Sequence, residues 1–455
     1  MKYKKRFFAL FLMINILASQ FLSGTAFASA TENTAKDWPT APSVNAESAI
    51  LMDLSSGAIL YEKNAHQPQY PASITKIMTT LLAIEHCSMS EIVTFSHDAV
   101  FGIEMGSSHI GIDEGERLTV EQSLYAIMLA SANEVSWGVG EHVAGTLSDF
   151  ANMMNARAKE LGCLNTHFVN ANGLHHDDHY TTAYDMALIS RAAMQYETFR
   201  KITSTKRYTI PPTNKHDVDN IFLNHHQMLM GNNYPQYKYE YCIGGKTGYT
   251  SKAGSTLVTF AKKGDMELVC VVMRANGAAS PENQYTDTTG LFNWAFENFT
   301  QYNISAAASE LEDSELPLFT KYQPLFDTKN TPLTLNNSSV LLPNEIALEE
   351  ATKNVTIYSD IKQTDSETVV GTITYTYNDR VVGNADIIFR ASDNNTLATV
   401  NPIKKVNAGS IRSLERYNLK PYIIAGIFTV IIASVIAYFY FSRRNKRNHK
   451  STLHF

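Results

Sequence analysis

The sequence has few cysteines, and none of them forms a recognisable motif. Four occur in 455 residues, without the CxxC spacing of redox and zinc sites. In an exported chain, four cysteines allow three disulfide pairings, and free buried thiols are a further alternative. The positions Cys87, Cys163, Cys242 and Cys270 therefore indicate no function.

The chain also lacks a long basic stripe between its two ends and shows no internal repeat. Its net charge is −6, so the electrostatic footprint of a nucleic-acid-binding protein is missing. Hydrophobic residues make up 44% of the chain and charged residues 18%, which excludes a disordered protein. The length is sufficient for one large core and a smaller domain. We therefore expect a folded two-domain protein without a nucleic-acid partner.

The N-terminus has the three parts of a secretory signal. A basic start at residues 2–6 precedes an apolar stretch at 7–17 and the small residues Ala28-Ser29-Ala30. We expect a signal peptide over residues 1–30 and a linker over 31–43. An uncleaved anchor is the alternative, and either one implies export.

Near the other end, residues 422–441 form an uncharged stretch of twenty residues. A helix of this length crosses a hydrocarbon core of about 30 Å. The tail at 442–455 is basic, and positive charge stays on the cytoplasmic side. We expect a single-pass transmembrane helix, a cytoplasmic tail and an extracytoplasmic remainder. A buried core helix is the alternative.

Strand patterns lie at both ends of a long helical region. A hairpin pattern surrounds Ser55-Ser56-Gly57, and apolar strand patterns return at 255–260 and 268–273. Strands that far apart suggest an α+β domain over residues 44–300, with one sheet built from distant segments. Helical patterns cover residues 74–82, 119–130, 148–161, 182–194 and 286–299, and Thr119 with Gln122 makes a capping box.

From about Tyr302 the composition becomes polar and acidic, and short β patterns follow. The stretches 372–377 and 385–389 alternate on either side of an Asn378-Asp379 turn. We expect a small all-β domain over residues 302–405, without a catalytic constellation.

Ser73 and Lys76 form a Ser-x-x-Lys motif where a helical pattern begins. Their spacing places both side chains on one face, and the Ser73 amide belongs to a helix N-terminus, where backbone donors are unpaired. A nucleophile, a base and an oxyanion donor can thus share one turn. Lysine serves as the base if burial or a second cation lowers its pKa. Alone, the motif is short enough to occur by chance on a solvated helix face.

Two further motifs follow in order. Ser131-Ala132-Asn133 lies at a break between helical patterns, where a loop can present a hydroxyl and an amide. Simple helix capping is its alternative. Lys246-Thr247-Gly248 precedes a strand pattern, and a cation beside a hydroxyl on a strand edge suits a terminal carboxylate. Its alternative is a glycine-rich turn with a solvated lysine. Lys246 would also supply the second cation that keeps Lys76 neutral.

The order SxxK, SxN, KTG is far less probable than any one of these motifs, and it is the set of penicillin-binding proteins and class A β-lactamases. Over about residues 45 to 300 the sequence resembles the serine D-alanyl-D-alanine carboxypeptidases, the low-molecular-mass penicillin-binding proteins. The resemblance includes residues 70–79, Asn172-Gly173-Leu174, 182–187 and 246–250. It implies a β-lactamase/transpeptidase-like α+β catalytic domain, in which an antiparallel sheet carries a helical subdomain.

The resemblance also implies a bacterial cell-membrane enzyme that removes the terminal D-alanine from peptidoglycan stem pentapeptides and that β-lactam antibiotics acylate. Ser73 would attack the penultimate D-alanine carbonyl, and Lys76 would take its proton. Ser131 would pass a proton to the departing D-alanine nitrogen. We expect no cofactor and no metal.

Substrate binding follows from the same resemblance. Asn133 would bind the stem-peptide amide, while Lys246 and Thr247 would hold the terminal carboxylate. The amides of Ser73 and Tyr249 would form the oxyanion hole.

Two features depart from the family pattern. Many relatives carry an acidic residue shortly before the KTG triad, where this chain has Ile243, so the role of that carboxylate is not carried over. Relatives often end in an amphipathic surface helix, whereas residues 422–441 predict a firmer, spanning anchor.

Two other functions fit parts of the pattern. A class A β-lactamase has the motif SDN and an added glutamate, whereas this chain has Ala132 and no obvious Glu-x-x-x-Asn element after Ser131. A non-catalytic peptidoglycan-binding protein would keep the cleft without the chemistry, although all polar residues of the cycle are present.

The run from His175 to His179 resembles a metal cluster in composition. Adjacent ligands on a short loop seldom converge without a rigid frame, so we interpret the run as a polar loop.

Overall fold

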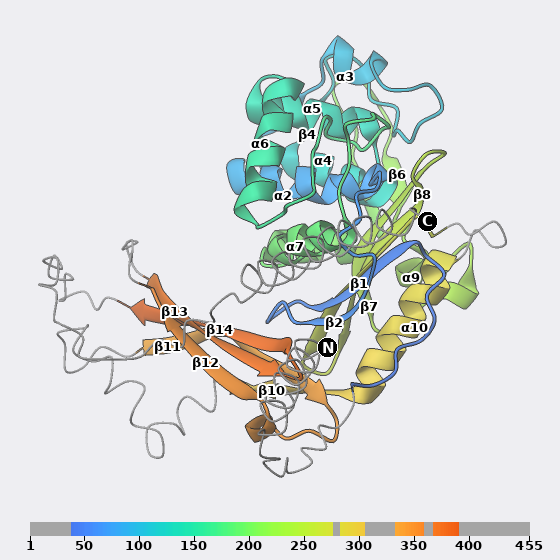
Figure 1. Ribbon diagram of the computed structural model, residues 1–455. Helices are drawn as coiled ribbons and strands as arrows, with labels where there is room; N and C mark the ends of the chain where they lie inside the picture. The colour runs from blue at the N-terminus through green and yellow to red at the C-terminus, as the bar shows by residue number, and fades with distance from the viewer. Residues whose placement is uncertain (1–37, 276–282, 305–332, 359–366, 391–455) are drawn as a thin grey trace, which may run out of the picture. The chain divides into compact units, whose positions relative to one another are not determined.

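The computed structural model describes residues 38–275, 283–304, 333–358 and 367–390 (Figure 1). The expected signal peptide, the stretch at 422–441 and the basic tail lie outside the described residues. Within the described ranges, no helix combines the length and the apolar character that a membrane span needs.

A five-stranded antiparallel sheet, ordered β2-β1-β9-β8-β7, forms the frame of the first part of the chain. It joins an early hairpin to three strands that follow the helical region, as the sequence predicts. The strands are β1 (Ser48–Asp53), β2 (Ile59–Lys63), β7 (Cys242–Thr250), β8 (Gly254–Lys263) and β9 (Met266–Met273).

Both faces of this sheet are buried. Along β8, Val258 and Phe260 pack in one hydrophobic core, while Leu257 and Ala261 pack in another. The first core includes α7 (Ala183–Ala193), and the second includes α10 (Asn283–Asn298), on the opposite side in Figure 1. Two-sided burial explains why the central strand β9 has a continuous apolar run over residues 268–273 instead of an alternating pattern.

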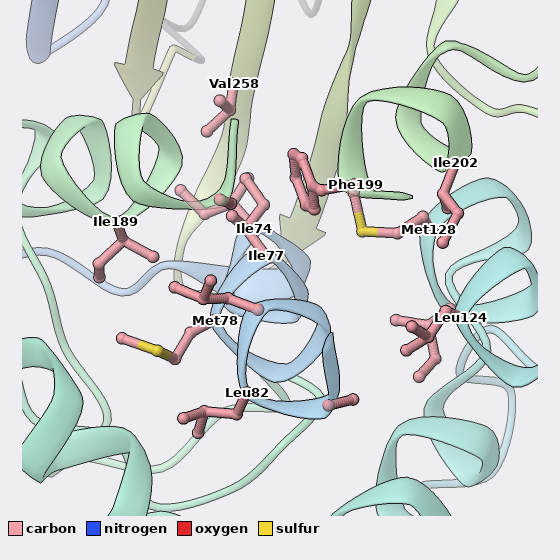
Figure 2. Close-up of a cluster of buried hydrophobic side chains, with 14 of the residues drawn as sticks. Ile74, Ile77, Met78, Leu82, Leu124, Met128, Ile189, Phe199, Ile202 and Val258 are labelled. Atoms are coloured by element: carbon pink, nitrogen blue, oxygen red, sulfur yellow. The ribbon is translucent and has the colours of Figure 1, made fainter. Parts of the chain in front are cut away.

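The helical region packs around α2 (Lys76–His86), which follows the short 3₁₀ helix η1 (Ala72–Thr75). Figure 2 shows Ile77, Met78 and Leu82 of α2 surrounded by apolar side chains of neighbouring helices and of β8. The other helices are α3 (His97–Phe101), α4 (Val120–Tyr125), α5 (Asn133–Ala144), α6 (Leu147–Glu160), α8 (Glu197–Ser204), α9 (Gln227–Met230) and the 3₁₀ helix η3 (Pro235–Tyr237). Short hairpin sheets pair β3 (Ile92–Thr94) with β4 (Arg117–Thr119), and β5 (Arg207–Ile210) with β6 (Asn220–Leu223).

The helix that begins after Thr119 has the predicted capping box. Thr119 Oγ1 accepts from the backbone N–H of Gln122 at 3.1 Å, and Gln122 Oε1 accepts from the backbone N–H of Thr119 at 2.8 Å. The helix does not stay regular, because α4 continues as a π-helix, η2 (Ala126–Ala130). It ends at Ser131, which has the left-handed φ of 60°.

A second five-stranded antiparallel sheet follows α10, in the order β10-β11-β14-β13-β12. The predicted turn joins β13 to β14, with φ of 47° at Asn378 and 61° at Asp379. The sheet begins at Phe299, inside the residues assigned to the catalytic domain from sequence. Its elements are β10 (Phe299–Asn303), β11 (Leu333–Pro343), β12 (Thr352–Ile357), β13 (Glu367–Tyr377) and β14 (Arg380–Arg390), with a 3₁₀ turn η5 (Leu348–Glu350).

Candidate active site

A cleft of about 600 Å³ lies beside the edge strand β7 and receives residues from all three predicted motifs. Among its described lining residues none is a lysine, an arginine or a carboxylate. Two lysines are buried next to the lining: Lys76 contacts Ser73, and Lys246 contacts the Thr247 carbonyl. Hydroxyl groups dominate the wall: Ser73, Ser107, Ser108, Ser131, Thr247, Thr250, Ser255 and Thr256.

The turn that carries Ser73 and Lys76 is short and constrained. Ala72, at its start, has a φ of 51°, which L-residues rarely adopt and which often marks a functional site. The buried Ile74 fixes the turn to the apolar core, so Ser73 is directed into the cleft while Lys76 is fully buried.

Lys76 Nζ has three close oxygen neighbours. It lies 2.7 Å from Asn133 Oδ1, 2.6 Å from the Asn172 carbonyl oxygen and 3.1 Å from Ser73 Oγ. The Asn133 and Asn172 oxygens can only accept hydrogen bonds. A neutral amine therefore gives its two N–H groups to these acceptors and turns its lone pair toward the Ser73 hydroxyl. In this geometry Lys76 can accept the Ser73 proton without rearrangement.

Burial lowers the pKa of Lys76 well below its usual value, and the charge of Lys246 lowers the pKa further. These are the two causes expected from the sequence. The negative charge of Glu134 raises the pKa of Lys76. Burial raises the pKa of the Glu134 carboxyl group, which disfavours that negative charge and so reduces its effect on Lys76.

Ser131 and Asn133 meet the cleft from the break between η2 and α5. Ser131 lines the cleft and is 5% exposed. Asn133 is the first residue of α5 and not part of the loop, in contrast to the sequence interpretation. The helix start holds its amide group between the cleft and Lys76.

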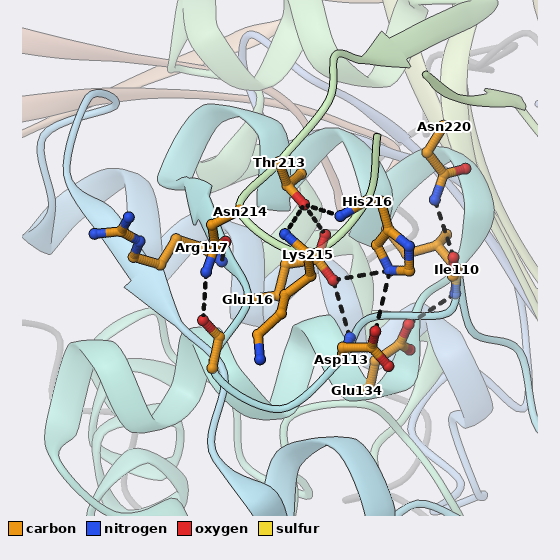
Figure 3. Close-up of polar contacts among 11 residues, drawn as sticks. Ile110, Asp113, Glu116, Arg117, Glu134, Thr213, Asn214, Lys215, His216 and Asn220 are labelled. Carbon is orange, nitrogen blue, oxygen red and sulfur yellow. Dashed lines mark hydrogen bonds and ion pairs between the residues drawn. The ribbon is translucent and has the colours of Figure 1, made fainter. Parts of the chain in front are cut away.

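Hydrogen bonds join this motif to the loop opposite, and Figure 3 shows two of the neighbouring contacts, those of Glu134 and Asn220 with Ile110. The Asn133 backbone amide donates to the Ser108 carbonyl at 2.9 Å, and Glu134 Oε1 accepts from the Ile110 amide at 2.7 Å. Asn220 donates to the Ile110 carbonyl at 2.9 Å from the other side. The cleft wall at Ser108 is thus fixed to the SxN motif.

Lys246 and Thr247 lie on β7, the edge strand that the sequence predicts. Lys246 is 1% exposed, and its Nζ donates to the Thr247 carbonyl at 2.9 Å. Burial lowers the pKa of Lys246 to about 7. The Thr247 residue faces the cleft, so a carboxylate there has a hydroxyl donor in front and a cation behind.

Gly248 lets β7 approach the turn that carries Ser73 and Lys76, called the catalytic turn below. A Cβ at this position would lie 2.9 Å from the Ser73 backbone nitrogen, closer than real Cβ contacts. On β8, Thr256 Oγ1 donates to the Pro71 carbonyl at 2.9 Å, just before the turn. This close packing places the strand that carries the Tyr249 amide beside the Ser73 amide, as an oxyanion hole requires.

Sequence reasoning missed two contributors to the site. Asn172 contacts Lys76 through its backbone carbonyl, which leaves no side-chain signature, although Asn172-Gly173-Leu174 belongs to the family resemblance. His225 lines the cleft, and burial, followed by the charge of Lys246, lowers its pKa.

The histidine run does not converge on one point. His179 is buried and contacts Thr75 and Val169, whereas His175 pairs with Asp177 at 3.3 Å near the surface. Elsewhere in the described chain, ligand atoms of Cys87, Glu91 and His142 lie within 4.8 Å of one another. All four cysteines are free thiols.

Comparisons with known proteins identify one family. The family model described as D-alanyl-D-alanine carboxypeptidase matches residues 34–277. The chain is 36% identical over 264 residues to D-alanyl-D-alanine carboxypeptidase DacF of Bacillus subtilis, a match that covers 57% of this chain and 64% of that protein. It is 32% identical over 301 residues to DacD of Escherichia coli, covering 64% of this chain and 72% of that protein. The chain thus spans slightly less than two thirds of the first relative.

Solved structures share the fold. Penicillin binding protein 6B from Escherichia coli aligns with a TM-score of 0.56 at 26% identity, over 77% of this chain and 97% of that one. The Streptomyces K15 DD-transpeptidase aligns with a TM-score of 0.52 at 26% identity, over 57% of this chain and all of that one. The expected α+β fold of transpeptidase type, with antiparallel sheets, is therefore confirmed.

Proposed function

The chain belongs to the D-alanyl-D-alanine carboxypeptidase family, and from this premise we propose that it removes the terminal D-alanine from peptidoglycan stem pentapeptides. One observation carries the proposal. Lys76 is buried with its pKa lowered, and two acceptors orient its amine so that the lone pair faces Ser73 at 3.1 Å. Such an arrangement converts a serine hydroxyl into a nucleophile.

In acylation, Ser73 Oγ attacks the penultimate D-alanine carbonyl while its proton moves to Lys76. The amides of Ser73 and Tyr249 receive the developing oxyanion, and loss of one such donor costs about 3 kcal/mol. The C–N bond breaks as the proton held by Lys76 passes through the Ser131 hydroxyl to the D-alanine nitrogen, which leaves Lys76 neutral again. Water then hydrolyses the ester and regenerates Ser73.

Recognition uses the edge of β7. Thr247 and the charge of Lys246 hold the terminal carboxylate, and Asn133 binds the amide of the extended stem peptide. A β-lactam presents a carboxylate and a reactive carbonyl in a similar relation, so the same residues direct penicillins to Ser73.

The test is mass spectrometry of a muropeptide pentapeptide incubated with wild type and with Ser73→Ala. We expect loss of one alanine with wild type only, and identical loss with both proteins would refute the proposal. Fluorescent penicillin should label wild type stably and leave Ser73→Ala unlabelled.

The same assays separate the alternative functions. Rapid release of hydrolysed penicillin would indicate a β-lactamase. Peptide binding without alanine release or penicillin labelling would indicate a non-catalytic binding protein.

We further propose that the enzyme is exported and held at the bacterial cell membrane by residues 422–441, with its active site outside. The uncharged stretch and the basic residues behind it support this proposal. The full chain should remain in the membrane fraction after carbonate extraction, and a chain that ends at residue 420 should be released. Release of both would contradict the anchor.

A further inference from the structure

His179 lies under the catalytic turn and has no role in the reaction as proposed above. Its side chain is 1% exposed. Its Nε2 is 2.9 Å from Thr75 Oγ1, and its Nδ1 is 3.0 Å from the Val169 backbone nitrogen. One imidazole thus connects the residue before Lys76 with a distant loop.

The contacts determine the tautomer of this ring. A backbone N–H can only donate, so Nδ1 of His179 accepts from Val169 and carries no proton. The neutral ring then has its proton on Nε2 and donates it to the Thr75 hydroxyl. Burial, with the nearby His167, His176, Lys76 and His175 as further causes, lowers the pKa of His179 to about 3, so the ring stays neutral at physiological pH.

The loop that starts at Val169 supplies an acceptor to Lys76. Its Asn172 carbonyl is one of the two groups that orient the amine, at 2.6 Å from Nζ. At Gly173, with a φ of 83°, an added Cβ would overlap the Ala72 carbonyl oxygen and lie 2.9 Å from Thr75 Oγ1. The loop and the turn are therefore in direct contact, and His179 bonds to both.

We propose that His179 is a positioning residue, which as a neutral, Nε2-protonated ring joins Thr75 to Val169 and so holds the Asn172 carbonyl where it aims the Lys76 lone pair at Ser73. The inference rests on the proposed function and adds a residue that determines the acylation rate without touching substrate. His175, in the same run, pairs near the surface and has no such connection.

The experiment compares His179→Leu, His179→Gln and Thr75→Val. Leucine removes both hydrogen bonds, valine removes only the hydroxyl, and glutamine offers one acceptor and one donor at the end of its side chain. Acylation by a penicillin and turnover of the pentapeptide are measured for each variant, with kcat and KM determined separately.

We expect His179→Leu and Thr75→Val to lower the acylation rate constant by about 10- to 100-fold, because small displacements of catalytic groups have effects of this size. KM should change less than kcat, since the cleft lining is intact. The double variant should be no slower than the slower single variant, because both changes break one connection. His179→Gln should recover most of the rate.

A matched control is Ser123→Ala in α4, which removes a hydrogen bond of 2.9 Å from the Ser123 hydroxyl to the Thr119 carbonyl, away from the turn. It should acylate at the wild-type rate. Wild-type acylation by His179→Leu, additive single effects, or a glutamine variant as slow as leucine would each overturn the inference. If His179→Leu fails to fold, Thr75→Val and His179→Gln still decide it.

The proposed function can fail separately, and failure of the wild type to react with penicillin or peptide would show this. A crystal structure of His179→Leu then decides the positioning role. The inference holds if Asn172 has moved away from Lys76 Nζ, and it falls if their contact is unchanged.

Discussion

Lys76 and Lys246 have opposite requirements although both are buried. In the proposed reaction, Lys76 must be neutral to accept a proton, whereas Lys246 must be charged to attract a carboxylate. Burial lowers both pKa values, that of Lys246 to about 7, and the charge of Lys246 also lowers the pKa of Lys76. The kcat/KM for peptide should therefore rise as pH passes the pKa of Lys76 and fall as pH passes about 7. Because the charges of Lys76 and Lys246 influence each other, the ascending and descending limbs of this pH profile report the pair and not either lysine alone.

Lys246→Gln tests this coupling. Without the neighbouring charge the pKa of Lys76 rises, so the ascending limb of penicillin acylation should move to higher pH. The KM for pentapeptide should rise at least about 10-fold through loss of the buried charge. Lys246→Arg retains the charge and should leave the ascending limb in place. An ascending limb that does not move in Lys246→Gln would contradict the coupling.

For single residues, the sequence identifies the reactive side chains better than the groups that they contact. Ser73, Lys76 and Lys246 stand in motifs whose chemistry can be inferred from residue type and spacing. The Asn172 carbonyl could not be found this way, because every residue has one and only the fold selects it. The polar neighbours of His179 favour a polar loop, whereas its burial depends on a contact with Thr75, 104 residues away in the sequence.

Among the elements, β7 and the catalytic turn must stay close together. Gly248→Ala would force its Cβ against the Ser73 amide and the Thr256 hydroxyl. We expect a loss of about 1–3 kcal/mol in the free energy of unfolding from overpacking, and acylation at least about 10-fold slower because the oxyanion donors separate.

Gly264→Ala is the matched control. Gly264, between β8 and β9, has a φ of 62° and no neighbour within 4 Å of an added Cβ. It should lose about 1 kcal/mol of stability through the left-handed backbone alone and acylate normally. Chemical denaturation and penicillin acylation measure both effects, and equal acylation by the two variants would contradict the role of close packing.

Helix starts were predictable because capping is local, as Thr119 and Gln122 demonstrate. The π-helical end of that helix was not, since the apolar pattern over 119–130 fits a regular helix equally well. The left-handed Ser131 is accompanied by a tertiary bond from Asn133 to Ser108, which no local pattern contains.

For the whole molecule, the described cleft is lined only by residues between Ser73 and Tyr285, so the second sheet contributes nothing to its wall. That sheet contacts the catalytic sheet through Ser339, whose hydroxyl donates to Asp53 at 3.2 Å and also meets Ser55. The α+β class and the sheet built from distant strands were predictable from pattern. The hydrogen bond between Ser339 and Asp53 was not predictable, because serine and aspartate occur at many turns without forming a contact between sheets.

Ser339→Ala should therefore separate stability from catalysis. Loss of the buried hydrogen bonds should cost about 1 kcal/mol and lower the Tm by a few degrees. The acylation rate should equal that of the wild type. Slower acylation in a folded variant would mean that the second sheet influences the cleft.

The buried thiols can be used to follow which part of the protein unfolds first. Cys163 packs in the core that includes α7, while Cys242 and Cys270 pack in the core that includes α10. Burial raises the pKa of Cys242 and of Cys270 to about 12, so in the closed molecule both remain as unreactive thiols. A thiol reagent added under mild denaturing conditions would label each cysteine when the hydrophobic core around it unfolds. The order of labelling would show which of the two cores unfolds first.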